Sequence, residues 1–487
     1  MEYNDKTAQG AIDELFTRGA GEFLDPDNAF RKKLEAKIKG EYVGDIVIKF
    51  GIDPTRPDIH LGHAVIFRKL RKFQDLGCKV VFLVGDYTAS IGDPTGKSKV
   101  RPEIEQQEIN NNMVSFLEQI DKILTVEKTK LPTGEVIIQN TPVFSWIRNS
   151  DWYTVVNDLK LPETYEVSFQ GNMDGMPVKV PVNANSLVGK AIVFEESRMQ
   201  TKSLGSKQVT VTTLRTFLWG LKHVTHARLI ERDMFQERIK KGEELYMHEM
   251  IYPVLQGIDS HAIGKIYGSC DLEVGGTDQT FNMLIGRDVM KASKQDPQAV
   301  LSFKLLIGLD GKEKMSKSLD NYVSITDSPE DMYGKLMSIP DTAIRDYFDL
   351  CTFTPVDVIE EMMTEMTNNK GNPKEVKMRL AHEIVSIYHG EEKAITAQKN
   401  FFEVFSEGKI PETIETVTVT SGSALADILI ANNIVSSKSD FRRLVTEGAI
   451  RNMETDEKIT DSAQNIVSGM TLKVGKRRFL KIEVQKA

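Results

Sequence analysis

Residues 46–84 constrain the possible folds of this chain more than any other stretch. Residues 46–48 (Ile-Val-Ile) form a short apolar run, and residues 80–84 (Val-Val-Phe-Leu-Val) form another. Between them, apolar residues recur near helical spacing until Gly77, which predicts a helix that ends there. Apolar runs this short predict parallel strands that are covered on both faces. The stretch therefore predicts a strand, turn, helix and strand of an α/β fold with a parallel sheet.

The turn in this unit has a distinctive sequence, Gly51-Ile52-Asp53-Pro54-Thr55-Arg56-Pro57-Asp58-Ile59-His60-Leu61-Gly62-His63. Its prolines keep the backbone extended, and Gly62 lets a ligand approach the unpaired N–H groups at the start of the helix. His60 and His63 project from one face of the first helical turn, where imidazoles suit phosphate oxygens. Taken alone, such a pair is more often a chance surface pair or half of a metal site.

A second motif lies far downstream, where Lys314-Met315-Ser316-Lys317-Ser318 follows the turn Leu309-Asp310-Gly311. By itself it would be a solvated basic loop. Together with the His-x-Gly-His turn it resembles the paired signatures of class I aminoacyl-tRNA synthetases, and it matches the second signature letter for letter. The resemblance implies a Rossmann-like catalytic domain that activates an amino acid with ATP.

Length and composition set broad limits on the chain. With 487 residues, it is too long for one core and is expected to form two to four domains. The sequence contains no apolar run long enough to span a membrane and does not begin like a signal peptide. We therefore expect a cytoplasmic protein. The widely separated cysteines, Cys78, Cys270 and Cys351, predict neither a disulfide framework nor a zinc site.

Residues 91–98 (Ile-Gly-Asp-Pro-Thr-Gly-Lys-Ser) superficially resemble a phosphate-binding P-loop. That motif needs a glycine where this chain has Ile91, so a P-loop is rejected. The loop nevertheless follows a predicted parallel strand, where doubly wound sheets bind ligands. Asp93 is therefore a candidate partner for a substrate ammonium group.

The pattern changes between residues 158 and 208. Residues 165–169 and 178–180 alternate as strands do, residues 191–194 form another apolar run, and Gly-Asn, Asp-Gly and Pro interrupt them. We predict a small β-rich insertion between the halves of a nucleotide-binding domain. A functional insertion and a decorative one fit this pattern equally well.

Two further segments carry candidate ligand-binding residues. On a helix, Tyr252, Gln256 and Asp259 would share one face, which is polar in an otherwise apolar segment. Such a face normally contacts solvent, but it can also line a polar pocket. Residues 272–279 (Leu-Glu-Val-Gly-Gly-Thr-Asp-Gln) predict a strand, a glycine turn and a helix headed by Asp278 and Gln279.

These segments narrow the resemblance to bacterial tyrosyl-tRNA synthetases. It implies a tyrosine-tRNA ligase that converts L-tyrosine and ATP into tyrosyl-adenylate and then charges tRNA(Tyr). The ATP is expected as its Mg²⁺ complex, with no tightly bound metal. The resemblance assigns the tyrosine ammonium to Asp93, Tyr252 and Gln256, the phenolic hydroxyl to Asp259, the adenylate or its amino-acid portion to Gly51, Asp53, Gly62, Asp278 and Gln279, and the ATP phosphates to Thr55, His60, His63, Lys314 and Lys317.

Lys49 departs from the pattern of many tyrosyl enzymes, which place a second phenol-binding tyrosine at this position. A bacterial subgroup has lysine here, so tyrosine stays the expected substrate. If Lys49 points inward, it either holds Asp259 ionised or replaces the missing tyrosine through a water molecule. The sequence does not choose between these two roles.

The resemblance also divides the chain into domains. Residues 1–335 would form the catalytic domain, residues 336–410 a helical anticodon-region domain, residues 411–422 a linker, and residues 423–487 an α+β S4-like RNA-binding domain. The formal charge is +3 from Ser421 onward and −11 before it, and a basic surplus suits a nucleic-acid partner. The candidate RNA-binding residues are Arg442, Arg443, Lys476, Arg477 and Arg478.

A homodimer is the expected assembly of such a chain. The segment between the nucleotide-binding halves would supply the interface, with Phe217, Leu218, Trp219 and Leu221 as candidate anchors. Ordinary core packing is equally compatible with these residues.

Two other functions stay open at the level of the sequence. A small-molecule nucleotidyltransferase would use the same His-x-Gly-His turn but would not need an S4-like tail. A non-catalytic RNA-binding descendant of a synthetase would keep the tail, yet it should have lost residues such as His60 or Lys317. Both residues are present.

Overall fold

The computed structural model describes residues 5–94, 104–130, 136–153, 167–173, 176–182, 200–204, 207–211, 214–368, 371–406, 416–432, 434–435, 437–475 and 478–485. The chain divides into two compact units. One comprises residues 1–58 and 65–305, and the other comprises residues 59–64 and 306–487.

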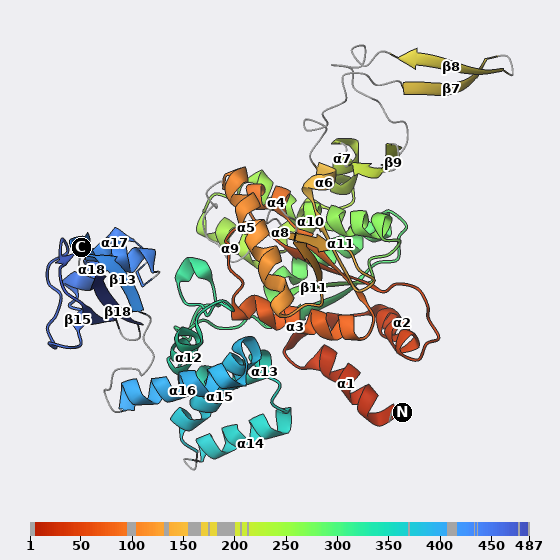
Figure 1. Ribbon diagram of the computed structural model, residues 1–487. Helices are drawn as coiled ribbons and strands as arrows, with labels where there is room; N and C mark the ends of the chain where they lie inside the picture. Colours follow the sequence, from red (N-terminus) through yellow and green to blue (C-terminus); the bar gives the residue numbers. More distant parts are fainter. Residues whose placement is uncertain are drawn as a thin grey trace. The chain divides into compact units, whose positions relative to one another are not determined.

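The first unit is built on a six-stranded sheet with the order β1-β12-β11-β2-β3-β6. In Figure 1, its strand β11 lies among the helices of this unit. Its strands are β1 (Ala20–Leu24), β2 (Val47–Ile52), β3 (Lys79–Val84), β6 (Phe144–Arg148), β11 (Leu272–Gly276) and β12 (Ala299–Phe303). All neighbours pair in parallel except β1, which runs antiparallel along β12. Every residue of β11 and β12 is buried, as expected for a parallel sheet covered on both faces. The predicted Rossmann-like parallel α/β fold is confirmed.

Helices connect and cover these strands. They are α1 (Asp5–Thr17), α2 (Ala29–Ile38), α3 (Leu61–Asp75), α4 (Asp86–Ile91), α5 (Gln106–Gln119), α6 (Ser150–Tyr153), α7 (Leu214–Lys222), α8 (His226–Ile230), α9 (Asp233–Lys241), α10 (Met247–Ile266) and α11 (Thr280–Ala292). Helices α10 and α11 pack closely. Gly257 allows this approach, because a Cβ atom at this position would lie only 2.9 Å from Cγ2 of Val289. This contact holds α10 beside the strand β11 that precedes α11.

Three two-stranded antiparallel ribbons accompany the sheet. They are β4 (Glu127–Lys130) with β5 (Val136–Gln139), β7 (Val167–Met173) with β8 (Met176–Val182), and β9 (Gln200–Leu204) with β10 (Lys207–Val211). The ribbon of β7 and β8 lies within the segment that the sequence predicts to be β-rich, and the ribbon of β9 and β10 extends to residue 211, just beyond its predicted end at residue 208. The apolar run at residues 191–194 lies outside the described residues.

The second unit contains a helical region between residues 329 and 406. Its helices are α12 (Pro329–Met337), α13 (Ile344–Cys351), α14 (Val356–Thr367), α15 (Pro373–His389) and α16 (Glu391–Ser406). Helix α15 places Leu380 and Ile384 one turn apart, and both are fully buried. Helices α12, α15 and α16 pack against one another.

The C-terminal part has a sheet and a core of its own. The sheet has the order β13-β18-β17-β15, formed by β13 (Thr416–Thr420), β15 (Ile450–Asn452), β17 (Met470–Val474) and β18 (Arg478–Gln485). Helices α17 (Leu425–Ala431) and α18 (Lys438–Thr446) contribute Leu429 and Phe441 to a cluster with Leu472 and Leu480. Within the described ranges, no helix is both long and apolar enough to cross a membrane.

Candidate active site

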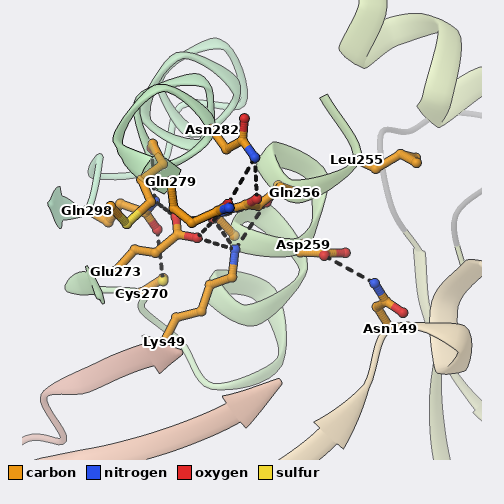
Figure 2. Close-up of polar contacts among 12 residues, drawn as sticks. Lys49, Asn149, Leu255, Gln256, Asp259, Cys270, Glu273, Gln279, Asn282 and Gln298 are labelled. Atoms are coloured by element: carbon orange, nitrogen blue, oxygen red, sulfur yellow. Dashed lines mark hydrogen bonds and ion pairs between the residues drawn. The ribbon is translucent and has the colours of Figure 1, made fainter. Parts of the chain in front are cut away.

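A buried ion pair lies where β2 and β11 run side by side (Figure 2). Lys49 and Glu273 are register partners on these parallel strands, and Nζ of Lys49 lies 2.9 Å from Oε1 of Glu273. Their side chains are 0% and 2% exposed. Nζ of Lys49 also donates to Oγ of Ser260 at 2.8 Å and to the carbonyl oxygen of Gln256 at 3.1 Å. Two strands and helix α10 therefore meet at one desolvated charge pair.

Side-chain amides extend this pair into a continuous polar network. Nε2 of Gln256 donates to Oε1 of Glu273 at 3.0 Å, while Oε1 of Gln256 accepts from Nδ2 of Asn282 at 3.0 Å. Asn282 also donates to Oε1 of Gln279 at 3.0 Å, and Nε2 of Gln279 donates to Oδ2 of Asp93 at 2.7 Å. The structure thus links Asp93, Gln256 and Gln279, three residues that the sequence assigns to tyrosine.

Tyr252 lies on the same helix and contacts a different acid. Its hydroxyl donates to Oδ2 of Asp53 at 2.7 Å, and Oγ1 of Thr88 donates to Oδ1 of Asp53 at 2.8 Å. Burial, followed by the charge of Asp53, raises the pKa of Tyr252 well above its usual value. Gly85 is required here because a Cβ atom would overlap the Asp53 carboxylate. Tyr252 therefore stays protonated and acts as a donor.

Asp259 is the third residue of the predicted polar face, and it is only 3% exposed. Its Oδ1 accepts from Nε1 of Trp152 at 3.0 Å, and its Oδ2 accepts from Nδ2 of Asn149 at 3.4 Å. Burial raises the pKa of Asp259 to about 6, while the ammonium of Lys49 is the largest opposing influence. Tyr252 and Asp259 are buried, and Gln256 between them is partly buried, so this face of α10 points mainly into the protein.

Arg232 belongs to this region, and it lies in the charged stretch of residues 228–233. It is 6% exposed, and Nη2 lies 4.0 Å from Oδ1 of Asp93. Its guanidinium lies over the rings of Phe235 and Phe281, with 5.4 and 5.7 Å to the centroids. The aromatic residue three positions later is the only local signal for this burial.

The glycine pair after β11 makes room for the turn that precedes α11. A Cβ atom on Gly276 would lie 2.7 Å from Oδ1 of Asp278, and one on Gly275 would lie 3.1 Å from Sδ of Met283. Asp278 and Gln279 form the short 3-10 turn Thr277–Gln279 that leads into the helix. Larger residues at the pair would displace both candidate ligand-binding side chains.

Gly51 and Thr55 border the end of β2. Gly51 is exposed, and a Cβ atom there would meet nothing closer than Cδ2 of Leu83 at 3.9 Å. The backbone N–H of Thr55 donates to the carbonyl oxygen of Asp53 at 2.8 Å, which closes the turn. The backbone at this strand end is accessible to a ligand.

The two histidines of the opening motif belong to the second unit. Their rings stack with centroids 3.8 Å apart, and Nδ1 of His60 is buried without a hydrogen-bond partner among the described residues. Burial, and to a smaller extent the positive charges of Lys317 and Lys314, lower the pKa of His60 to about 3. Burial also lowers the pKa of His63, with smaller contributions from His60, Lys317 and Lys314. Both imidazoles are therefore neutral at physiological pH. A Cβ atom on Gly62 would lie 3.0 Å from the His60 ring.

The basic loop in the second unit is anchored by its methionine and by Asn321. Met315 is buried, and its N–H donates to the carbonyl oxygen of Leu306 at 2.7 Å. Oδ1 of Asn321 accepts from the N–H of Ser316, and its Nδ2 donates to Oδ2 of Asp310, both at 2.8 Å. These contacts fix the backbone on which Lys314 and Lys317 stand half-buried.

The candidate RNA-binding residues differ in their surroundings. Arg442 is exposed on α18, and Arg443 pairs with Asp440 and Glu447 on the same helix. Arg478 donates to the carbonyl oxygen of Ile434. Lys476 and Arg477 lie outside the described residues. Across the ranges that the structure describes, no group of three or more His, Cys, Asp or Glu residues is arranged to hold a metal.

Comparison with known proteins decides the family. The sequence model of the family described as tRNA synthetases class I (W and Y) matches residues 43–164 and 183–406. The tyrosine–tRNA ligase of Carboxydothermus hydrogenoformans is 34% identical, over 97% of this chain and 98% of that protein. The chain belongs to the class I tyrosine–tRNA ligases. The predicted class I synthetase resemblance is confirmed.

Other tyrosine–tRNA ligases are similar to the same extent. The tyrosine–tRNA ligase 2 of Clostridium acetobutylicum is 35% identical over 97% of this chain and 99% of that protein, and the Thermotoga maritima ligase is 36% identical over 90% of each. A C-terminally truncated mitochondrial tyrosyl-tRNA synthetase of Aspergillus nidulans shares the fold. Its solved structure has a TM-score of 0.52 and 20% identity, and covers 82% of this chain and 97% of that one.

One ribbon of this ligase lies outside the match to the family. The family model leaves out residues 165–182, which include β7 and β8. The family match therefore does not include this ribbon.

Proposed function

We propose that this chain activates L-tyrosine with ATP and transfers the tyrosyl group from the resulting adenylate to tRNA(Tyr). The observation that carries the proposal is the inward-facing polar side of α10, on which Tyr252, Gln256 and Asp259 each bond to polar partners inside the first unit. A polar face of this kind is suited to hold a polar ligand.

In this proposal, residues at different positions along α10 recognise the two ends of tyrosine. Asp93, Tyr252 and Gln256 bind the ammonium group, with Gln279 holding the Asp93 carboxylate in place at 2.7 Å. Asp259 accepts a hydrogen bond from the phenolic hydroxyl. Phenylalanine would leave that buried carboxylate without the phenolic donor, which is costly, and tyrosyl-tRNA synthetases are themselves the standard example of this discrimination.

The chemical step needs positioning and charge stabilisation more than covalent chemistry. The tyrosine carboxylate attacks the α-phosphorus of ATP, the bond to the β-phosphate oxygen breaks, and pyrophosphate leaves. ATP enters as its Mg²⁺ complex, so the metal ion is part of the substrate. In the second step, a terminal hydroxyl of tRNA attacks the adenylate carbonyl and AMP leaves.

We assign the remaining candidate residues to ATP. Gly51, Asp53, Gly62 and Asp278 contact the adenylate portion. The phosphate groups are contacted by Thr55, His60, His63, Lys314 and Lys317. Because the pKa of His60 is lowered to about 3, its neutral ring donates an N–H without carrying charge, and the two lysines supply the charge that stabilises the leaving pyrophosphate.

Binding of tRNA is assigned to the C-terminal half. Residues 336–410 would bind the anticodon region, and the S4-like residues 423–487, after a linker at 411–422, would contact the phosphate backbone. Arg442 is the exposed candidate on α18, and Arg443, Lys476, Arg477 and Arg478 complete the set. We expect the reaction to take place in the cytoplasm, where protein synthesis consumes charged tRNA.

A homodimer completes the proposal. Leu218 on α7 is 55% exposed, whereas Phe217, Trp219 and Leu221 are partly buried against the core that includes Val254 and Ile258. Leu218 is therefore the anchor that a second copy would cover. Light scattering at micromolar concentration should give twice the chain mass, and a monomeric mass would contradict the dimer.

Aminoacylation tests the function directly. The purified chain, incubated with ATP, Mg²⁺, labelled tyrosine and a tRNA(Tyr) transcript, should produce acid-precipitable tyrosyl-tRNA. Two controls are a reaction without ATP and a reaction in which a tRNA for another amino acid replaces tRNA(Tyr). Tyrosine-dependent pyrophosphate exchange without any charging would mean that the second step is absent.

A further inference from the structure

The Lys49–Glu273 pair contacts the side-chain amide of Gln256 (Figure 2). We propose that this buried ion pair fixes the orientation of the Gln256 side-chain amide, so that its carbonyl oxygen faces the ammonium group of tyrosine. Lys49 and Glu273 are then positioning residues that act through Gln256. The inference rests on the proposed binding of tyrosine at α10.

The chemistry of the groups sets the amide orientation. A carboxylate only accepts hydrogen bonds, so the Gln256 group that faces Oε1 of Glu273 at 3.0 Å must be the NH₂ group. The carbonyl oxygen then faces the other way, where Nδ2 of Asn282 donates to it at 3.0 Å. A carbonyl oxygen has a second lone pair, and an ammonium group has only donors. The reversed amide would present its own donors to tyrosine.

The Glu273 side chain is surrounded by donors. Oε1 is 2.9 Å from Nζ of Lys49 and accepts from Gln256, while Oε2 accepts from Ser260 at 3.1 Å and from Gln298. Each of these four groups donates in this arrangement, so a proton on Glu273 would displace one of them. The arrangement therefore suits a carboxylate.

Lys49 stabilises the buried carboxylate of Glu273. A buried carboxylate without a counter-charge is strongly unfavourable, and Lys49 supplies that charge from the neighbouring register position. Oγ of Ser260 accepts from Lys49 at 2.8 Å while donating to Glu273, which ties the pair to α10. Gly286 on α11 allows this packing, because a Cβ atom there would lie 2.9 Å from Oγ of Ser260.

A purely structural role for the pair makes a different prediction from a positioning role. If only an ion pair is required, exchanging the two charges would restore function. If residue 273 must accept a hydrogen bond from Gln256, the exchange would not restore function. The lysine ammonium at position 273 can only donate, so the carbonyl oxygen of Gln256 would turn toward it and the NH₂ group would face tyrosine. The charge-exchanged variant therefore separates the two roles.

The experiment measures tyrosine-dependent ATP–pyrophosphate exchange on the full chain. In Glu273→Gln, whose new amide imposes no single orientation on Gln256, KM for tyrosine should rise tenfold or more while KM for ATP stays within twofold. The double variant Lys49→Glu with Glu273→Lys should keep the raised KM for tyrosine. A control is Arg238→Met with Glu249→Gln, because that ion pair is also buried, with both side chains 4% exposed, and its further hydrogen bonds reach Glu244 and Tyr246. It should leave KM for tyrosine within twofold.

Two results would overturn the inference: an unchanged KM for tyrosine in folded Glu273→Gln, or its recovery in the charge-exchanged variant. If the exchanged variant does not fold, Glu273→Gln decides alone, because glutamine has the shape of glutamate. A parent protein without tyrosine-dependent exchange would reject the proposed function itself. A parent that activates tyrosine, with variants unchanged, would reject only the role of the pair.

Discussion

Trp152 donates its indole N–H to the carboxylate of Asp259 across 3.0 Å, and both residues are buried. Asn149 reaches the other carboxylate oxygen at 3.4 Å. Because an ionised carboxylate offers about four acceptor positions, these two donors hold Asp259 in place and leave acceptor capacity for a phenolic hydroxyl. Neither donor carries a charge that would neutralise the carboxylate.

The first prediction concerns pH. Asp259 accepts from tyrosine fully when ionised, and burial raises its pKa to about 6. The kcat/KM for tyrosine should therefore fall as the pH drops through about 6, and Asp259→Asn should abolish this inflection. The pKa of His60, lowered to about 3, excludes that residue as its source. An inflection that persists in Asp259→Asn would contradict the assignment.

The same group affects stability in a defined direction. Its folded pKa of about 6 lies above the ordinary value of 3.8, so the folded protein binds this proton more tightly than the unfolded chain does. Between these values, the contribution of Asp259 to the free energy of unfolding declines as pH rises. Asp259→Asn should remove this decline.

A second prediction concerns Lys317 in the loop anchored by Met315 and Asn321. Lys317→Ala should slow adenylate formation about a hundredfold, which corresponds to roughly 3 kcal/mol for one donor to developing charge. Equilibrium binding of tyrosine should stay nearly unchanged, because the lysine acts on charge that appears late. The exposed Lys312 in the same loop provides the control. Equal exchange rates in Lys317→Ala and the parent would remove the loop from the mechanism.

A third prediction concerns Lys69, whose ammonium lies inside the first unit. It is 9% exposed, and Nζ donates to the carbonyl oxygen of Glu14 at 3.2 Å. Burial, with a smaller effect of Lys72, lowers its pKa from 10.5 to about 7. The unfolded chain therefore holds more protons between these values, and the contribution of Lys69 to the free energy of unfolding rises with pH.

Lys69→Met tests this directly. The substitution should stabilise the protein by about 1–3 kcal/mol at pH 6, where the parent buries a charged lysine. The difference should shrink at pH 9.5. Lys72→Met is the control, because the Lys72 side chain is 38% exposed. Denaturant unfolding at both pH values measures the difference in free energy of unfolding between Lys69→Met and the parent. The same difference at both pH values would contradict the prediction.

The fold follows from local sequence features more directly than the contacts of the site do. Gly77 predicts the end of a helix, and the structure ends α3 at Asp75 with Gly77 at a φ of 77°, a conformation that favours glycine. The shared face of Tyr252, Gln256 and Asp259 likewise follows from helical periodicity. Periodicity encodes neighbours along one element, and these features are of that kind.

The partners of these residues could not be predicted from local patterns. The register of β2 against β11 places Lys49 opposite Glu273, whereas the sequence connected Lys49 only with Asp259 or a missing tyrosine. Asn149 reaches Asp259 across 110 residues of sequence. Arg232 lies in a charged run yet is buried, because aromatic rings from two helices cover its guanidinium. These contacts depend on tertiary packing.

A fourth prediction concerns the C-terminal module. Strand β13 pairs with β18, so a clean truncation ends at residue 415. The truncated variant, residues 1–415, should retain tyrosine-dependent exchange. It should lose most tRNA charging at physiological salt, because the basic surplus lies in the removed part. Retained exchange is the internal control for folding of the catalytic domain. Unchanged charging would show that the module is not an RNA-binding element.

The amino acid that the enzyme activates distinguishes a tyrosine enzyme from a tryptophan enzyme, and the matched family includes both. ATP–pyrophosphate exchange with each of the twenty amino acids measures this choice. We predict strong exchange with tyrosine and little with phenylalanine or tryptophan, because each of the latter leaves the Asp259 carboxylate without a phenolic donor. Exchange with phenylalanine or tryptophan at a rate comparable to that with tyrosine would contradict the assignment of tyrosine as the substrate.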